Sequence, residues 1–191
     1  MGLDQRIGDR FLRAGPAYGG SCFPKDTRAL IDIGNKFKTD LTIVKSVVAS
    51  NNSRKTLLLE RVKSILNNKL KNKKITFLGV TFKPNTDDMR EASSIPMISY
   101  LNKKNSKINY YDPSGEKVEF KNLKNVKFSN SIKSACLNAD LVILHTEWND
   151  FKLLNFKKLV KKNNFKIFDM RNIYSSLKMK KLNIKYYGIG R

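Results

Sequence analysis

The feature that most constrains the fold of this chain is a series of short, almost continuous apolar runs in its second half. Helical patterns at residues 95–101, 132–137 and 151–160 fill the gaps between them. Strands that are apolar on both faces and alternate with helices are typical of a parallel sheet covered on both sides. We therefore expect an α/β fold with a Rossmann-like parallel sheet, in which ligands bind beyond the carboxyl ends of the strands. The expected strands are residues 74–80, 108–112, 141–145 and 165–169, with residues 184–187 as a possible edge strand.

The first part of the chain has helical patterns and no convincing strand. Residues 27–37 form one apolar pattern at helical spacing, and residues 41–66 form a long one for which Asp40 is a plausible N-cap. The charged stretch at residues 67–74 then marks a boundary. The chain is thus expected to divide into a central helical region with the long helix, residues 1–70, and an α/β domain, residues 71–191.

Cys22 lies between a glycine-rich turn and the start of a helix. Gly19 and Gly20 allow positive φ and a close approach to a ligand, and Pro24 suits the first turn of the helix. Cys22 would then lie at the positive end of the helix with Lys25 one turn away, and both influences favour the thiolate. The alternative is a buried structural cysteine at an ordinary loop-to-helix junction.

Composition limits the classes of protein that remain. A chain of 191 residues with 40% hydrophobic residues can form a real core. The net charge of +22 raises a nucleic-acid alternative, but the lysines are scattered among many asparagines without a recognisable nucleic-acid motif. We therefore expect solvated lysine-rich faces and no nucleic-acid partner.

The number of cysteines and the length of the apolar runs indicate in which cellular compartment the protein is expected. Cys22 and Cys136 do not make a disulfide framework, so a reducing cytoplasm is expected, with Cys136 as a buried small apolar residue. No apolar run approaches the roughly twenty residues needed to cross a bilayer, and the first residues lack the apolar stretch of a signal peptide. We expect no membrane partner.

Several motifs in this order resemble the nucleotide-sugar dehydrogenases of the UDP-glucose/GDP-mannose dehydrogenase family, over almost the full chain. Their order along the chain is hard to obtain by chance. The motifs are Arg6-Ile7-Gly8, Phe11-Leu12, Tyr18-Gly19-Gly20-Ser21-Cys22-Phe23-Pro24-Lys25-Asp26, Phe82-Lys83-Pro84-Asn85-Thr86-Asp87-Asp88-Met89-Arg90-Glu91, Thr146-Glu147-Trp148 and Phe168-Asp169-Met170-Arg171-Asn172.

The resemblance implies an NAD-dependent, two-step oxidation of the C6 alcohol of UDP-glucose to a carboxylate. Cys22 would attack the aldehyde and carry the thioester, and Asp26, one helical turn away on the same face, would help to orient the hydrolytic water. Asp26 could instead only complement the helix dipole. Lys25 and Arg90 are expected to contact NAD.

The family pattern also implies the residues around the UDP-sugar. Arg6 resembles an arginine that reaches into the neighbouring subunit's site, Arg13 could equally have a surface role, and residues 86–88 could form only a helix-capping turn. His145 ends a buried strand and is expected to be structural rather than a general base. The implied substrate contacts are Arg6, Phe11, Arg13, Tyr18, Gly19, Lys83 and Arg171.

One family element is missing from these residues. No Gly-x-Gly-x-x-Gly turn follows a first strand, so the N-terminal NAD-binding domain is expected to be absent and the chain alone inactive. A split gene with the NAD-binding domain on a separate chain, a truncation and a fragment remain open. The broad apolar face of the helix at residues 41–66 predicts a homodimer. The alternatives are a dehydrogenase for UDP-N-acetylmannosamine, UDP-N-acetylglucosamine or GDP-mannose, and a non-catalytic UDP-sugar-binding or assembly module.

Overall fold

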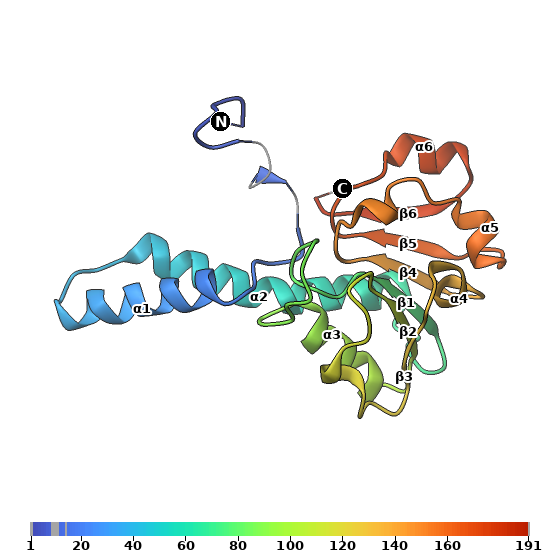
Figure 1. The fold of residues 1–191 in the computed structure, drawn as a ribbon, viewed down its shortest axis with the longest axis horizontal. Helices are drawn as coiled ribbons and strands as arrows, with labels where there is room; N and C mark the ends of the chain where they lie inside the picture. The colour runs from blue at the N-terminus through green and yellow to red at the C-terminus, as the bar shows by residue number, and fades with distance from the viewer. Residues whose placement is uncertain (1, 9–11, 14, 191) are drawn as a thin grey trace.

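A helical hairpin projects from an α/β sheet domain in the computed structural model, which describes residues 2–8, 12–13 and 15–190 (Figure 1). Helix α1(Cys22–Lys36) and helix α2(Thr42–Ile65) run in opposite directions and pack along each other. We call residues 21–57 the helical arm. From Leu58 onward, α2 belongs to the sheet domain, because Leu58, Val62 and Ile65 are buried in its core.

The two helices of the arm confirm the helical patterns of the sequence and correct their ends. Helix α1 begins at Cys22, with Pro24 in its first turn. The expectation for Asp40 was wrong, since Leu41 is the N-cap of α2. The Asp40 carboxylate instead accepts hydrogen bonds from Thr42 Oγ1 at 2.6 Å and Lys45 Nζ at 2.9 Å, so side-chain donors satisfy it in place of helix amides.

The described residues form a six-stranded, wholly parallel sheet in the order β3-β2-β1-β4-β5-β6. This is the strand order of the doubly wound Rossmann fold. In the registered pairing, Ile75 of β1 lies between Ile108 of β2 and Leu141 of β4. The strands are β1(Lys74–Leu78), β2(Lys107–Tyr111), β3(Val126–Phe128), β4(Leu141–Leu144), β5(Lys166–Asp169) and β6(Lys185–Gly188).

Short helices connect the strands. The expected helix at residues 151–160 begins only at Phe156, because Asn155 caps it through a 3.2 Å hydrogen bond from Lys158 N to Oδ1. The sequence patterns missed α6 and β3, which are both short and lysine-containing. The helices are α3(Ser94–Lys103), α4(Ile132–Cys136), α5(Phe156–Val160) and α6(Ser176–Lys181), with 3₁₀ helices η2(Val118–Phe120) and η3(Asn149–Phe151).

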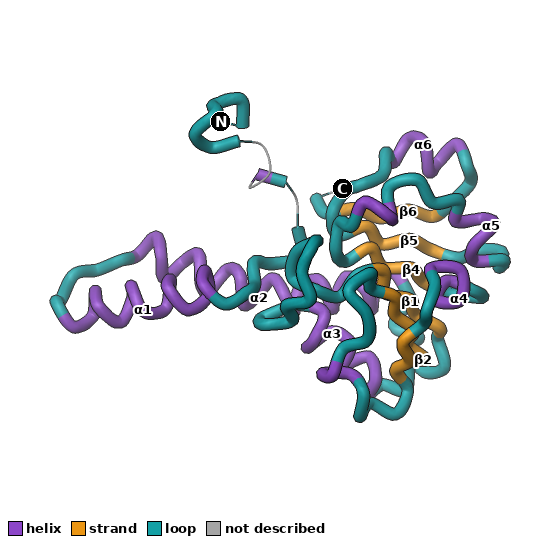
Figure 2. Tube along the Cα trace, viewed as in Figure 1, coloured by secondary structure: helices purple, strands orange, loops and turns teal. Residues whose placement is uncertain are grey.

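Both faces of the sheet are covered, as the apolar strands predicted. Figure 2 shows α2 and α3 on one side of the strands and α4, α5 and α6 on the other. Phe77 of β1 belongs to the core under α2 and α3, and its neighbour Leu78 belongs to the core under the other helices. Among the described residues, no helix has both the length and the apolar character needed to cross a bilayer.

Candidate functional site

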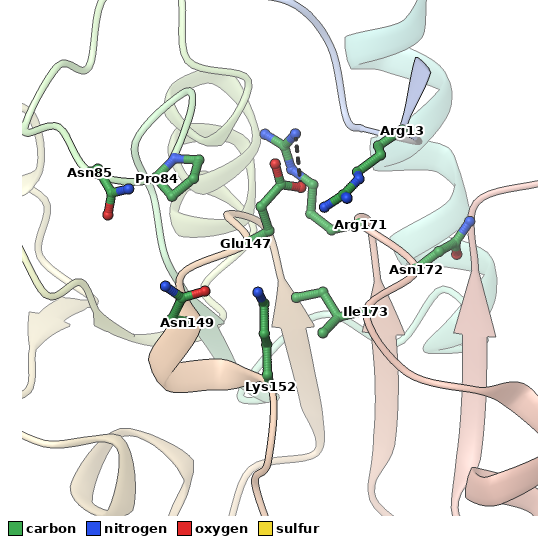
Figure 3. Close-up of a pocket in the computed structure, with 9 residues that line it drawn as sticks. All are labelled: Arg13, Pro84, Asn85, Glu147, Asn149, Lys152, Arg171, Asn172 and Ile173. Atoms are coloured by element: carbon green, nitrogen blue, oxygen red, sulfur yellow. Dashed lines mark ion pairs between the residues drawn. The ribbon is translucent and has the colours of Figure 1, made fainter. Parts of the chain in front are cut away.

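A cavity of about 670 Å³ opens at the carboxyl ends of β1, β4 and β5 (Figure 3). Strands β1 and β4 are neighbours, and the chain leaves them toward opposite edges of the sheet, so this is the topological switch point of the fold. The volume lies within the range of small-molecule sites. The lining residues are Arg13, Pro84, Asn85, Glu147, Asn149, Lys152, Arg171, Asn172 and Ile173.

The charges that line the cavity are mostly positive. Arg13, Lys152 and Arg171 carry three positive charges against the one carboxylate of Glu147, which leaves a net charge of +2 among these lining residues. In Figure 3, Arg13 and Arg171 reach the cavity from different segments of the chain, and the Lys152 ammonium points toward it between Asn149 and Ile173. Cationic groups beside amide side chains suit a phosphate or diphosphate group.

Arg171 ties the ends of three strands together. Its Nε donates to His145 O at 3.0 Å, one terminal nitrogen donates to Phe82 O at 2.9 Å, and the other lies 3.5 Å from Glu147 Oε2. Its side chain is only 11% exposed. Burial lowers the pKa of Arg171, and Glu147 and Asp169 oppose that change, but a guanidinium keeps its charge in proteins. The residue therefore offers a fixed cation at the cavity wall.

Asp169 shapes the loop that carries Arg171. Its carboxylate accepts hydrogen bonds from Arg171 N at 3.0 Å, Tyr174 N at 3.0 Å and Tyr186 Oη at 2.9 Å. Burial raises the pKa of Asp169 above its usual value, and these hydrogen bonds oppose that rise only in part. The loop that bears Arg171 is thus held by hydrogen bonds from its own backbone and from the side chain of Tyr186 on β6.

The acidic residue at the end of β2 does not fit a contact with the ribose of a dinucleotide. In a dinucleotide-binding unit, an acidic residue at the end of the second strand holds the ribose. Here Asp112 occupies that position, but it is buried and accepts from Val80 N at 2.8 Å, Thr81 N at 3.4 Å and Ser114 N at 3.0 Å. Its carboxylate is satisfied by the protein.

His145 is structural, as its place at the end of a strand indicated. Its ring is fully buried, with Nε2 2.8 Å from Ser93 Oγ and Nδ1 3.1 Å from Thr146 Oγ1. Burial, with a smaller effect of the Arg171 charge, lowers the pKa of His145 to about 3. A ring that stays neutral and walled in at ordinary pH cannot serve as an accessible base.

Cys22 is exposed at the first position of α1, which excludes the buried structural cysteine. Its Sγ lies 3.6 Å from Ser21 Oγ. Arg90 lies beside the turn that carries Cys22, because its carbonyl oxygen accepts a 2.8 Å hydrogen bond from Gly20 N. Cys136 is buried, as expected, and burial raises the pKa of its thiol to about 12.

The glycines before Cys22 pack closely against other parts of the protein. Gly20 has φ of +85°, and a Cβ there would lie 2.7 Å from the Phe82 ring. Gly19 does not have positive φ, and a Cβ there would lie 2.8 Å from Glu91 O. These glycines let the turn before Cys22 pack on the loop that follows β1.

The predicted cofactor residues and Lys83 lie outside the cavity lining. Lys25 and Asp26 are exposed and 3.4 Å apart. Arg90 donates to both carboxylate oxygens of Asp88, at 2.9 and 2.8 Å, and that pair lowers the pKa of Asp88. Lys83 is exposed, with Nζ 5.4 Å from the Phe82 ring centroid.

Of the remaining predicted substrate residues, Arg13 and Arg171 line the cavity. Tyr18 is not among the lining residues, and Asn51 contacts its backbone nitrogen and oxygen at 2.9 and 3.2 Å. Arg6 is exposed and pairs with Asp4 at 2.6 Å. Phe11 lies outside the described residues.

Sequence reasoning assigned no role to four polar lining residues, Asn85, Asn149, Lys152 and Asn172. All four follow the ends of β1, β4 or β5, so the strand-end rule could have found them. Asn172 is fixed by two hydrogen bonds to the backbone of Ile189, at 3.1 and 3.0 Å. Among the described residues, no group of three or more His, Cys, Asp or Glu side chains could hold a metal ion.

Comparison with known proteins agrees with this geometry. The chain is 39% identical over 193 residues to UDP-glucose 6-dehydrogenase of Rickettsia felis, covering all of this chain and 43% of that protein. It is 39% identical over 194 residues to UDP-glucose 6-dehydrogenase of Rhizobium meliloti, covering all of this chain and 44% of that protein. The chain thus spans less than half the length of these curated relatives.

A solved UDP-glucose dehydrogenase from Pyrobaculum islandicum superposes with a TM-score of 0.80 at 28% identity, over 98% of this chain and 41% of that one. Residues 76–176 match the UDP binding domain of the UDP-glucose/GDP-mannose dehydrogenase family, and residues 1–53 match its central domain. The chain therefore belongs to the UDP-glucose/GDP-mannose dehydrogenase family.

Proposed function

We propose that this chain supplies the UDP-sugar site and the thiol of an NAD-dependent UDP-glucose 6-dehydrogenase. Residues 1–70 would be the central region, whose last helical turns pack into the sheet core, and residues 71–191 would be the UDP-binding domain. The observation that carries the proposal is the cavity at the switch point, where Arg13, Lys152 and Arg171 converge. These cations would hold the diphosphate of UDP-glucose. The names of the relatives support UDP-glucose as the sugar nucleotide.

Cys22 would act on the C6 aldehyde that the first oxidation produces. Its Sγ forms a bond to C6 while the thiol proton passes to the carbonyl oxygen, and after the second oxidation the resulting thioester holds the sugar. Water then breaks the bond between Sγ and C6, which returns the proton to the thiol and releases the carboxylate. Asp26, exposed on the same helix one turn later, would orient that water.

NAD would accept a hydride in each of the two oxidations. Lys25 and Arg90 fit a contact with this cofactor, because both are exposed cations near the Cys22 turn. The sheet does not fit the rest of the dinucleotide, since the Asp112 carboxylate is occupied by backbone amides. We propose that these 191 residues alone do not reduce NAD with UDP-glucose, and NADH formation by the purified chain would contradict this.

Substrate contacts by Arg6, Phe11, Tyr18, Gly19 and Lys83 remain part of the proposal. Arg6 would serve the site of a neighbouring subunit, which suits its exposure of 88%. The exposed Cys22 must stay reduced to react, so a reducing compartment such as the cytoplasm suits the chemistry.

We further propose a homodimer formed through the helical arm. Ile43 and Val47, one turn apart on α2, are 81% and 42% exposed. They line a groove of about 490 Å³ together with Tyr18, Asn51 and Arg54. An apolar strip of this kind is costly in water, and a second copy of the arm would cover it.

Calorimetric titration tests the UDP-sugar site. UDP and UDP-glucose should bind the 191-residue chain, and GDP-mannose should bind more weakly. Lys152→Met should weaken UDP binding about tenfold through the loss of one charge-assisted contact. Lys157→Met, which removes an exposed lysine outside the cavity lining, is the matched control and should leave the affinity unchanged. Equal affinities for the two lysine variants, or no UDP binding by the parent chain, would contradict the proposed site.

A further inference from the structure

Glu91 has a backbone conformation that its residue type does not favour. Its φ is +55°, in the left-handed region that non-glycine residues rarely adopt. Glycine would adopt this conformation without strain. Such a conformation persists only where the surrounding structure holds it in place.

The Glu91 carboxylate links both helices of the arm. Its Oε1 accepts from a terminal nitrogen of Arg28 on α1 at 2.7 Å, and its Oε2 accepts from Lys55 Nζ on α2 at 3.0 Å. The Lys55 side chain is only 18% exposed, so this ion pair is partly shielded from water. Hydrogen bonds from Arg28 and Lys55 lower the pKa of Glu91, which keeps the carboxylate ionised at neutral pH.

The backbone around Glu91 supports the turn that carries Cys22. Gly20 N donates to Arg90 O at 2.8 Å, and Gly19 packs so closely on Glu91 O that a Cβ would lie 2.8 Å from it. The same loop begins after β1 and contributes Pro84 to the cavity lining. One loop therefore contacts both the thiol-bearing turn and the UDP cavity.

We propose that Glu91 is a positioning residue that, through Arg28 and Lys55, holds the Cys22 turn in place relative to the UDP-sugar cavity. This inference rests on the proposed function, because it concerns where the sugar of a bound UDP-sugar meets the thiol. Loss of the Glu91 charge would leave the cavity residues in place and release the helical arm from the loop. The chain would still bind UDP, but the Cys22 thiol would no longer have a fixed position relative to the bound UDP-sugar.

Protection of Cys22 from alkylation measures this link in the full 191-residue chain. Iodoacetamide should modify the exposed Cys22 while the buried Cys136 serves as an internal control. In the parent chain, saturating UDP-glucose should slow Cys22 alkylation at least tenfold, and UDP, which lacks the sugar, should slow it less than twofold. In Glu91→Gln, UDP-glucose should bind with a dissociation constant within threefold of the parent value, but the protection should fall below threefold.

Three further variants make the result specific. Glu91→Gly removes the backbone strain together with the carboxylate, so it should stay folded and still lose protection. Lys55→Met should lose protection in the same way. Glu60→Gln removes another glutamate–lysine pair on α2, with Lys63 at 2.8 Å, and should keep full protection.

The two proposals fail in different ways. If UDP-glucose neither binds nor protects the parent chain, the proposed function is wrong. If the parent chain is protected and Glu91→Gln and Glu91→Gly are protected equally well, the UDP-sugar site stands and the role of Glu91 is overturned.

Discussion

The helical arm and the sheet domain differ in how far they bury their large apolar side chains. In the sheet domain, Ile143 of β4 is fully buried between strands and helices. In the arm, Ile43 of α2 is 81% exposed, and Phe37 and Leu57 are 70% and 65% exposed. The sheet domain thus completes its own core, whereas the arm carries large apolar side chains that the described residues leave exposed.

The largest expected difference between the regions concerns stability. Ile143→Ala should lower the free energy of unfolding by about 4 kcal/mol, because it opens a cavity in a fully packed core. Ile43→Ala should lower it by less than about 0.5 kcal/mol in the monomer, since its side chain is already in water. Urea denaturation at a protein concentration low enough to keep the chain monomeric measures both. Equal losses would remove the distinction between the regions.

A charge on the arm should break the proposed homodimer. Ile43→Glu should weaken dimerisation at least about 100-fold, equivalent to about 3 kcal/mol, because a carboxylate would be buried in an apolar contact. Sedimentation equilibrium measures the dissociation constant, and Val118→Glu, at an exposed apolar residue of η2, is the control with the same change of charge. A parent chain that stays monomeric at high concentration would rule out the homodimer.

The junction between the regions should be sensitive at Gly20. Gly20→Ala should cost about 3 kcal/mol, because alanine is strained at positive φ and its Cβ would lie 2.7 Å from the Phe82 ring. Gly115 has φ of +92° but open space around it, so Gly115→Ala should cost only about 1 kcal/mol. Thermal unfolding of both variants separates steric clash from backbone strain. A Gly20→Ala variant no less stable than Gly115→Ala would contradict the close packing of the junction.

The smallest effect is a pH dependence confined to the sheet domain, which holds the only histidine of the chain. The pKa of His145 is about 3 in the folded state and about 6.5 in the unfolded state. Above pH 6.5 the ring is neutral in both states and stability is complete, whereas at lower pH only the unfolded chain takes up the proton. The free energy of unfolding should therefore fall by about 1.4 kcal/mol between pH 7.5 and 5.5.

Urea denaturation across this pH range checks the histidine effect. His145→Gln, which cannot titrate but can still form a hydrogen bond to Ser93, should be less stable throughout and should lose the slope. An identical slope in both proteins would assign the pH dependence to other groups.

The sequence predicted the strands of the sheet more completely than the residues of the site. Apolar runs predicted five of the six strands because β1, β4 and β5 are buried on both faces, while β3 has only three residues and no buried one. Arg13 and Arg171 were expected near the substrate and line the cavity. The role of Asn149 depends on the path of the loop after β4, which no local pattern fixes.

Long-range contacts account for what the sequence could not predict. The glycines before Cys22 are typical of a ligand loop, yet they pack on Phe82, a residue more than sixty positions away in the chain. In the same way, Asp112 has the position of a ribose-binding acid, but the amides of Val80 and Thr81 occupy it. Residue types such as these predict the local backbone conformation. Whether the residue then contacts a ligand or another part of the protein depends on tertiary contacts that the local sequence does not show.

The most direct test of the account uses a UDP-glucose analogue with a chloroacetamido group at C6, followed by mass spectrometry of the modified peptides. If the cavity holds UDP and directs the sugar toward Cys22, the analogue should alkylate Cys22 stoichiometrically, leave Cys136 unmodified, and react far faster than free chloroacetamide. Excess UDP should lower the rate of Cys22 alkylation by the analogue to the rate of free chloroacetamide. Alkylation at the rate of free chloroacetamide, or alkylation that UDP does not slow, would contradict a thiol that faces the UDP-sugar.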